Sequence, residues 1–191
     1  MEILLDIIRS VDYNILLLIA DKLRGGVLDP VMTMLSLMGN GGAVWITLAV
    51  LLLFFRKTRR AGVAMLLALA AGYVIGNLCI KELVMRPRPF VTHSDLTALL
   101  DPGDPWSFPS GHALSSFAAA TALWCFHKKT GVLALVLAAL IAFSRLYASV
   151  HYPTDVLAGM LIGIALAHAA AFLTDRIIDT FHSIRLRKGD K

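Results

Sequence analysis

Long apolar runs constrain this chain more than any other feature. Residues 61–84, 131–147 and 154–175 contain few charged residues, and each run is too long for a strand of a soluble core. Hydrophobic residues make up 58% of the 191 residues, against roughly half in a typical soluble domain. We therefore predict an integral membrane protein with one all-α domain, residues 1–191, built as a polytopic helical membrane bundle.

Breaks between the runs predict five membrane spans, or six if the N-terminal helix also crosses. The five expected spans cover residues 28–55, 61–84, 112–126, 131–147 and 154–175. Gly39-Asn40-Gly41-Gly42 divides the first of them, so residues 28–38 and 43–55 form either one kinked span or two segments. Two pairs of small residues, Gly72 with Gly76 and Gly159 with Gly163, predict faces where helix backbones approach closely.

Residues 1–26 predict an amphipathic N-terminal helix. Asp6, Arg9 and Asp12 interrupt one side of an apolar stretch, and Arg24-Gly25-Gly26 ends it. A helix with one charged side is typical of the membrane interface. We expect this helix to lie in the interface or to be partly inserted.

Basic residues indicate which ends of the spans face the cytoplasm. They cluster at residues 56–60, at residues 127–129 and in the C-terminal tail, which carries Arg185, Arg187, Lys188 and Lys191. By the positive-inside rule these clusters, and with them the C-terminus, are expected to be cytoplasmic. Loop 85–111 and turn 148–154 then face the extracytoplasmic side of the cell membrane.

Three polar clusters interrupt the apolar chain, and all of them belong to that extracytoplasmic face. They are Lys81 with Arg88-Pro89, then Pro109-Ser110-Gly111-His112, then Ser144-Arg145 with His151 and Asp155. Charged groups in a membrane are costly and therefore indicate function. Three cations, two imidazoles and one carboxylate can hold a phosphate and break its ester or anhydride bond. The excess of cations would repel Mg²⁺, so we expect no metal.

The cations and the glycine turn fit the binding of phosphoryl oxygens. Lys81, Arg88 and Arg145 can neutralise a phosphate dianion, although basic side chains near helix ends also reach for water and lipid headgroups. Ser110 and Gly111 open a helix, where free backbone N–H groups attract anions. Ser110 can equally serve as a helix cap.

The histidines fit proton transfer and nucleophilic attack. His112, in the first turn of its helix, can protonate a departing oxygen. His151 and Asp155 are four residues apart, so on a helix the carboxylate can accept from one ring nitrogen and leave the other as a nucleophile. The alternatives are that His151 acts as a base toward water and that Asp155 only caps a helix.

Other polar residues receive no role in the predicted site. Arg86 has no evident partner in the three clusters, and Asp101 and Asp104 fit turn formation better than a weak cation site. The remaining histidines are expected in loops, the tail or helix packing; they are His93, His127, His168 and His182.

Taken together, the clusters resemble the signature of the type 2 phosphatidic acid phosphatase family. That signature is a lysine, six residues and Arg-Pro; then Pro-Ser-Gly-His; then Ser-Arg, five residues, a histidine, three residues and an aspartate. Lys81 with Arg88-Pro89 matches its first part, residues 109–112 match the second, and Ser144-Arg145 with His151 and Asp155 matches the third. The resemblance implies a helical membrane bundle with the site at its extracytoplasmic end.

The resemblance also implies a mechanism without a metal or another cofactor. His151 attacks phosphorus to form a phosphohistidine, His112 protonates the leaving group, and Asp155 orients His151. The groups implied to bind phosphoryl oxygens are Lys81, Arg88, Arg145 and the N–H groups of Ser110 and Gly111.

The expected function is therefore hydrolysis of a membrane lipid phosphate, with the bilayer and the lipid as partners. The resemblance favours undecaprenyl pyrophosphate, with phosphatidylglycerophosphate and phosphatidic acid as alternatives. A phosphotransferase and a non-hydrolytic phospholipid-binding transporter or scaffold stay open. The net charge of +5 lies at membrane boundaries and in the three clusters, so no nucleic-acid partner is expected.

Overall fold

The computed structural model describes the backbone of residues 2–189 and the side chains of residues 2–180. Over this part the chain is helical and forms no strand, only an isolated bridge between Pro87 and Trp106, which confirms the predicted all-α class. The α-helices are α1 (Glu2–Leu23), α2 (Leu28–Gly39), α3 (Ala43–Leu53), α4 (Arg59–Gly72), α5 (Lys81–Val84), α6 (Pro89–Thr92), α7 (Gly111–Phe126), α8 (Lys128–Tyr147) and α9 (Pro153–Gly189). Two shorter helical segments of other types lie between them, the 3₁₀ turn η1 (Asn40–Gly42) and the π-helix η2 (Tyr73–Ile80).

Four helical stretches of the described chain are long and apolar enough to cross a membrane. They are Leu28–Leu53, Arg59–Val84, Lys128–Tyr147 and Pro153–Thr180. The predicted number of five to six spans is not confirmed. The expected span 112–126 corresponds to α7, which has only 16 residues, fewer than the roughly 20 of a usual span.

The first of these stretches is one kinked unit, which answers the question left open by the glycine cluster. Gly41 and Gly42 have φ angles of 59° and 68° between α2 and α3. Glycine adopts positive φ without steric cost, so the chain turns here and continues as a helix. The turn places Asn40 at the wall of the cavity described below.

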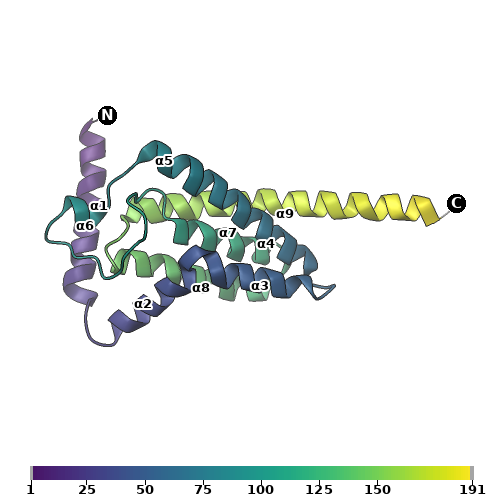
Figure 1. Cartoon of the computed structure of the whole chain (residues 1–191), viewed down its shortest axis with the longest axis horizontal. Helices are drawn as coiled ribbons and strands as arrows, with labels where there is room; N and C mark the ends of the chain where they lie inside the picture. The colour runs from purple at the N-terminus through teal and green to yellow at the C-terminus, as the bar shows by residue number, and fades with distance from the viewer. Residues whose placement is uncertain (1, 190–191) are drawn as a thin grey trace.

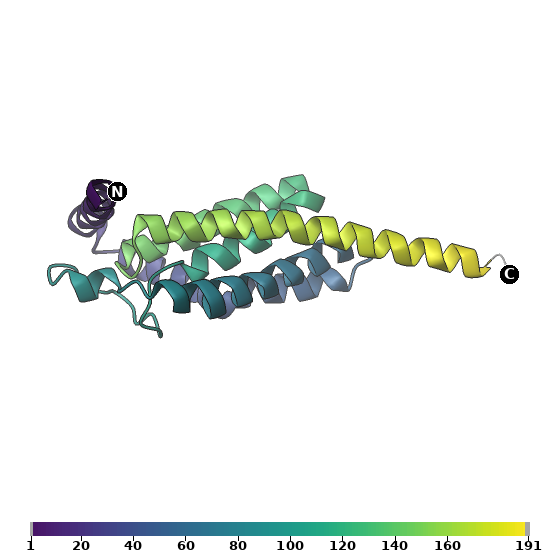
Figure 2. The same ribbon diagram turned by 90° about the horizontal axis from the view of Figure 1, so that it is seen from above.

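Helix α7 is the centre of the bundle and packs against α4, α8 and α9 (Figures 1 and 2). Glycines permit this close packing, as the small-residue pattern predicted. A Cβ atom on Gly163 would lie 2.5 Å from the carbonyl oxygen of Leu114, and one on Gly159 would lie 2.6 Å from that of Ser110. On the other side, Gly72 and Gly76 receive the side chain of Leu114.

Helix α1 lies across one end of the bundle, beside α6 and the loop that precedes α7 (Figure 1). Its apolar residues are largely exposed, among them Ile3, Ile7 and Val11, while Asp12 and Leu16 are buried against the rest of the chain. The location of α1 in the membrane interface stays a prediction.

The basic clusters at residues 56–60 and 127–129 lie together at the opposite end of the bundle from α1 (Figures 1 and 2). Arg60 is held there by Asp175 and Asp179 of α9, at 3.0 and 2.9 Å. This common end agrees with the charge pattern, whereas the side of the membrane that it faces stays a prediction. The basic residues of the tail and His182 lie outside the described side chains.

We expect Gly163→Val to destabilise the bundle, because the new side chain meets the backbone of α7. Overpacking of this kind costs roughly 1–3 kcal/mol, and the loss is measured as a lower midpoint of unfolding in detergent. Ala165→Val, at an exposed position of the same helix, is the control. Equal midpoints for the two variants would contradict a stabilising contact at Gly163.

Candidate active site

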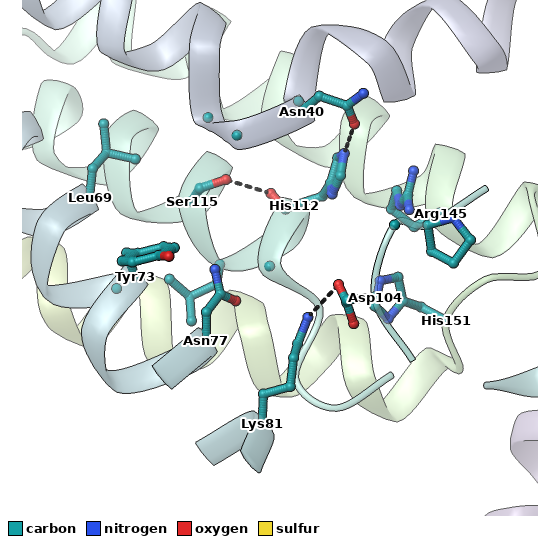
Figure 3. Close-up of a pocket in the computed structure, with 18 of the residues that line it drawn as sticks. Asn40, Leu69, Tyr73, Asn77, Lys81, Asp104, His112, Ser115, Arg145 and His151 are labelled. Atoms are coloured by element: carbon teal, nitrogen blue, oxygen red, sulfur yellow. Dashed lines mark hydrogen bonds and ion pairs between the residues drawn. The ribbon is translucent and has the colours of Figure 1, made fainter. Parts of the chain in front are cut away.

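Residues from all three sequence clusters meet around one cavity of about 640 Å³ (Figure 3). The predicted site residues that line it are Lys81, Arg88, Gly111, His112, Arg145 and His151. They lie at the α1 end of the bundle, on α5, on the first turn of α7, at the end of α8 and in the loops beside them. The other two predicted residues, Ser110 and Asp155, are fully buried behind this wall.

Lys81 and Arg88 share one carboxylate, that of Asp104. The Lys81 Nζ lies 3.1 Å from one oxygen of Asp104, and the Arg88 Nη2 lies 2.9 Å from the other. Burial alone would raise the pKa of Asp104, but the two cations lower it below its ordinary value. An anion therefore already occupies the point where these two cations converge.

Arg145 lines the cavity and has one unsatisfied donor. Its Nη1 donates to the Ser36 hydroxyl of α2. Its Nε is buried, and no hydrogen-bond partner for it exists among the described residues. Buried polar groups are nearly always paired, so an unpaired guanidinium N–H beside a cavity indicates a site that accepts an anionic oxygen.

His151 is buried and held by a backbone carbonyl. Its Nδ1 donates to Ser107 O at 2.7 Å, while the nearer oxygen of Asp155 is 3.7 Å away. The Nδ1 proton therefore leaves Nε2 with its lone pair, 3.4 Å from Arg88 Nη1. Burial lowers the pKa of His151 to about 4, against the opposing effect of Asp155, so the imidazole is neutral at pH 7.

His112 stands on the other side of the cavity, against the kink between α2 and α3. Its Nε2 lies 2.9 Å from the Asn40 side-chain oxygen and 3.1 Å from Ser36 O, which are both acceptors. Its ring packs on Gly39, where a Cβ atom would lie 2.6 Å from the imidazole. The kink thus fixes the direction in which His112 points (Figure 3).

The N–H groups of Ser110 and Gly111 were both expected to bind phosphoryl oxygens, and the structure leaves only one of them available. Ser110 caps the helix through its hydroxyl, which accepts from Ala113 N, and its own N–H donates to the carbonyl of Asp155 at 3.1 Å. That N–H is therefore engaged in joining α7 to α9. Gly111, at the first position of the helix, retains an N–H without an intrahelical acceptor and lines the cavity.

Arg86, which the sequence left without a partner, joins the site through Asp155. Its Nη1 lies 2.6 Å from Asp155 Oδ1, and its Nη2 lies 2.8 Å from Asp12 of α1. The prediction that nothing pairs Arg86 with the clusters is wrong. Asp12 also contacts Thr154, which lies 142 positions away in the sequence. No local sequence pattern reveals a contact between such distant positions.

Two further polar residues of the cavity were missed from the sequence. Asn77 touches Gly111, since a Cβ on that glycine would lie 3.2 Å from its side-chain oxygen. It precedes Lys81 by four residues, a helical spacing that places both on one face and was a usable signal. Asp104 was assigned to a turn, and because it lies 16 residues after Arg88 and 23 after Lys81, no local spacing linked it to these cations.

The cavity extends from its polar end along an apolar wall. Ile46 of α3, Leu66 and Leu69 of α4, and Leu114 of α7 line this part, with Tyr73 beside them (Figure 3). A ligand that fills the whole cavity needs an anionic group at one end and apolar atoms at the other.

Known proteins are similar to this chain in sequence and in fold. An undecaprenyl-diphosphatase of Sulfolobus acidocaldarius is 38% identical over 63% of this chain and 58% of its own length. The undecaprenyl-diphosphatase BcrC of Bacillus subtilis is 31% identical over 74% of this chain and 72% of its own. The crystal structure of a PAP2-type phosphatidylglycerolphosphate phosphatase from Bacillus subtilis superposes with a TM-score of 0.73 and 28% identity, over 88% of this chain and 87% of that one.

Some of the relatives are matched over little more than half of their length. The family model of the PAP2 superfamily, in contrast, matches residues 61–178 and so includes all three polar clusters and the helices that carry them. On the strength of this match and of the shared fold, the chain belongs to the PAP2 superfamily.

Proposed function

We propose that this protein hydrolyses the phosphate or pyrophosphate group of a membrane lipid without a metal ion. One observation carries the proposal: His112, His151 and three cations line a single cavity that continues along an apolar wall. A site for binding alone needs the cations but no neutral, oriented imidazole beside them.

In the first step, the lone pair of His151 Nε2 attacks phosphorus and the bond to the leaving oxygen breaks. Arg88, Lys81 and the free Nε of Arg145 stabilise the negative charge on the phosphoryl oxygens. Burial and the nearby charge of Arg145 lower the pKa of His112 to about 3, so in this proposal His112 takes up a proton together with the anionic substrate. It then gives its Nε2 proton to the leaving oxygen, which replaces Asn40 as the acceptor. The products of this step are the lipid alcohol or lipid phosphate and a phosphohistidine at position 151.

In the second step, water releases the phosphate. His112, now neutral, takes a proton from the water, whose oxygen attacks phosphorus as the bond to Nε2 breaks. Inorganic phosphate leaves, and His151 regains its lone pair. Ser107 O keeps the Nδ1 proton in place through both steps, which makes this carbonyl the group that sets the tautomer.

Undecaprenyl pyrophosphate is the substrate we propose first, at the extracytoplasmic face. Two relatives are named as undecaprenyl-diphosphatases, and the apolar wall suits a long isoprenoid chain. The grouping of basic residues at the end of the bundle opposite the site supports an extracytoplasmic cavity and a cytoplasmic C-terminus. Phosphatidylglycerophosphate, named in a structural relative, and phosphatidic acid are the alternatives.

For a substrate to bind, Asp104 must release its ion pairs with Lys81 and Arg88. A phosphoryl group bound by Lys81 and Arg88 takes the place of a carboxylate that now accepts from both. Asp104 has a side chain 40% exposed and lies in a loop, so it can turn toward solvent. Its neighbour Asp101 lines the same cavity but instead accepts from the N–H of Gly103.

We expect His151→Asn to abolish phosphate release from lipid while the protein keeps its fold. The test measures phosphate released in detergent from undecaprenyl pyrophosphate, phosphatidylglycerophosphate and phosphatidic acid at equal surface fraction. Wild-type activity should survive a chelator, because no metal is needed. Phosphate release by the variant at the wild-type rate would refute His151 as the nucleophile, and an inactive wild type on all three lipids would refute the proposed function.

We expect Asp104→Asn to bind inorganic phosphate and vanadate more tightly than the wild type, because no resident anion competes for Lys81 and Arg88. The inhibition constant should fall at least several-fold, as measured by competition against the lipid substrate. Asp101→Asn is the matched control and should leave the constant unchanged. A higher inhibition constant in Asp104→Asn would mean that Asp104 positions the cations instead of competing with the substrate.

The lowered pKa of His151 predicts a pH-dependent loss of stability. In the unfolded chain His151 takes up a proton below about pH 6.5, whereas in the folded protein it does so only near pH 4. The unfolded state therefore binds more protons between these values, and the wild type should lose stability as the pH falls through this window. His151→Asn lacks this contribution. Unfolding midpoints of both proteins between pH 7 and 4 should therefore converge on the acidic side, and parallel curves would contradict a buried neutral imidazole.

A further inference from the structure

Helix α1 reaches the catalytic turn through one buried carboxylate. Most of α1 is exposed, yet Asp12 retains only 1% of its accessible surface. Its Oδ1 accepts from the backbone N–H of Thr154 at 3.0 Å, and its Oδ2 accepts from the Thr154 hydroxyl at 2.5 Å. Asp12 therefore caps the first turn of α9 from outside, next to Asp155.

Arg86 connects this cap to the carboxylate of Asp155. One arm of the guanidinium group pairs with Asp12 Oδ2 and the other with Asp155 Oδ1, at 2.8 and 2.6 Å. Its Nη1 also donates to the hydroxyl of Thr154 at 2.7 Å. The plane of the group lies over the Tyr152 ring, 3.9 Å from its centre. Arg86 is thus fixed on four sides, and none of these contacts faces the cavity.

Asp155 divides its two oxygens between this network and the turn that carries His151. Oδ1 faces Arg86, while Oδ2 accepts from the N–H of Tyr152 at 2.8 Å and lies 3.7 Å from His151 Nδ1. Rotation of the carboxylate would therefore disturb both the position of the His151 backbone and the charge beside its ring. The charged hydrogen bond from Arg86 Nη1 to Oδ1 opposes that rotation.

We propose that Arg86 and Asp12 are positioning residues, which hold Asp155 and the 151–155 turn in the orientation that His151 needs, so that helix α1 completes the active site. This inference rests on the proposed function for its kinetic part. Arg86 is the cation that both buried carboxylates of this network contact, with His151 neutral, so its loss would leave the two carboxylates uncompensated.

Contacts of two other residues also hold α1 in place against the rest of the chain. Tyr13, one position after Asp12, stacks on His93 at 4.2 Å between ring centres, and its hydroxyl donates to Asp95. After the helix, Arg24 donates to Tyr147 O at 2.8 Å and to the Ser149 hydroxyl at 2.7 Å. These contacts fasten α1 at its middle and at its end to the two loops that flank the site.

Arg86→Gln tests the proposal, because a lost positioning residue should lower kcat and leave KM nearly unchanged. We expect kcat to fall roughly 10- to 100-fold, the range found when outer groups that orient a functional ligand are lost. KM should stay within about twofold, because Lys81, Arg88 and Arg145 still bind the phosphate. Arg86→Lys, which can pair with only one of the two carboxylates, should lie between. Asp6→Asn, in an exposed ion pair of α1, is the control.

A charge-neutral double variant separates positioning from stability. Arg86→Gln leaves Asp12 and Asp155 buried without their cation, and Asp12→Asn leaves Arg86 with one carboxylate fewer, so each single variant also loses stability. In Asp12→Asn/Arg86→Gln we expect the unfolding midpoint to recover toward the wild type while kcat stays low, since Asp155 still lacks Arg86. Recovery of both together would overturn the proposal and leave the network a purely structural one.

Hydrogen exchange gives a readout that does not depend on hydrolysis. In Arg86→Gln the amides of residue 152 and residues 154–156 should exchange at least several-fold faster, whereas those of α7 should not change. Equal exchange in this turn overturns the inference even if the protein is an active phosphatase. Faster exchange in an enzyme that releases no phosphate would instead support the coupling and refute the proposed function.

Discussion

The burial of charge at one end of an apolar bundle is the constraint on which the rest of this structure depends. A buried ion without a partner costs several kcal/mol, so each cation that the fold brings together must be balanced. Lys81 and Arg88 share the carboxylate of Asp104, and Arg86 pairs with both Asp12 and Asp155. Within the described side chains, the buried Nε of Arg145 is the exception. The site is thus stable as it stands and still has a donor left for an anion.

Helix packing brings these charged groups and the two histidines around one cavity. Glycines at positions 159 and 163 let α9 approach the backbone of α7, which places the turn before α9 beside the start of α7. The hydrogen bond from Ser110 N to Asp155 O joins those two points directly. His112 and His151 consequently stand on one cavity although they belong to different helices and loops.

Sequence reasoning predicted which residues line the cavity better than it predicted their contacts. The spacing of Lys81, Arg88 and Arg145 predicted a common anion site, and the structure brings all three to one cavity. The expected partner of His151 was Asp155, yet the shorter contact is to the backbone carbonyl of Ser107. Side-chain types are visible in a sequence, whereas backbone carbonyls carry no signal of their own. Contacts such as Asp12 with Thr154 join distant positions and were invisible for the same reason.

The sequence by itself determined the apolar helices, the glycine faces and the three clusters of reactive residues, because hydropathy, small-residue spacing and motif spacing are local properties. Only the tertiary structure decided how the charges are shared. Arg86 has a partner because α1 crosses the end of the bundle, and Asp104 faces Lys81 because its loop folds back over the cavity. Coulomb interactions depend on distance in space, and that distance becomes defined only when the helices pack.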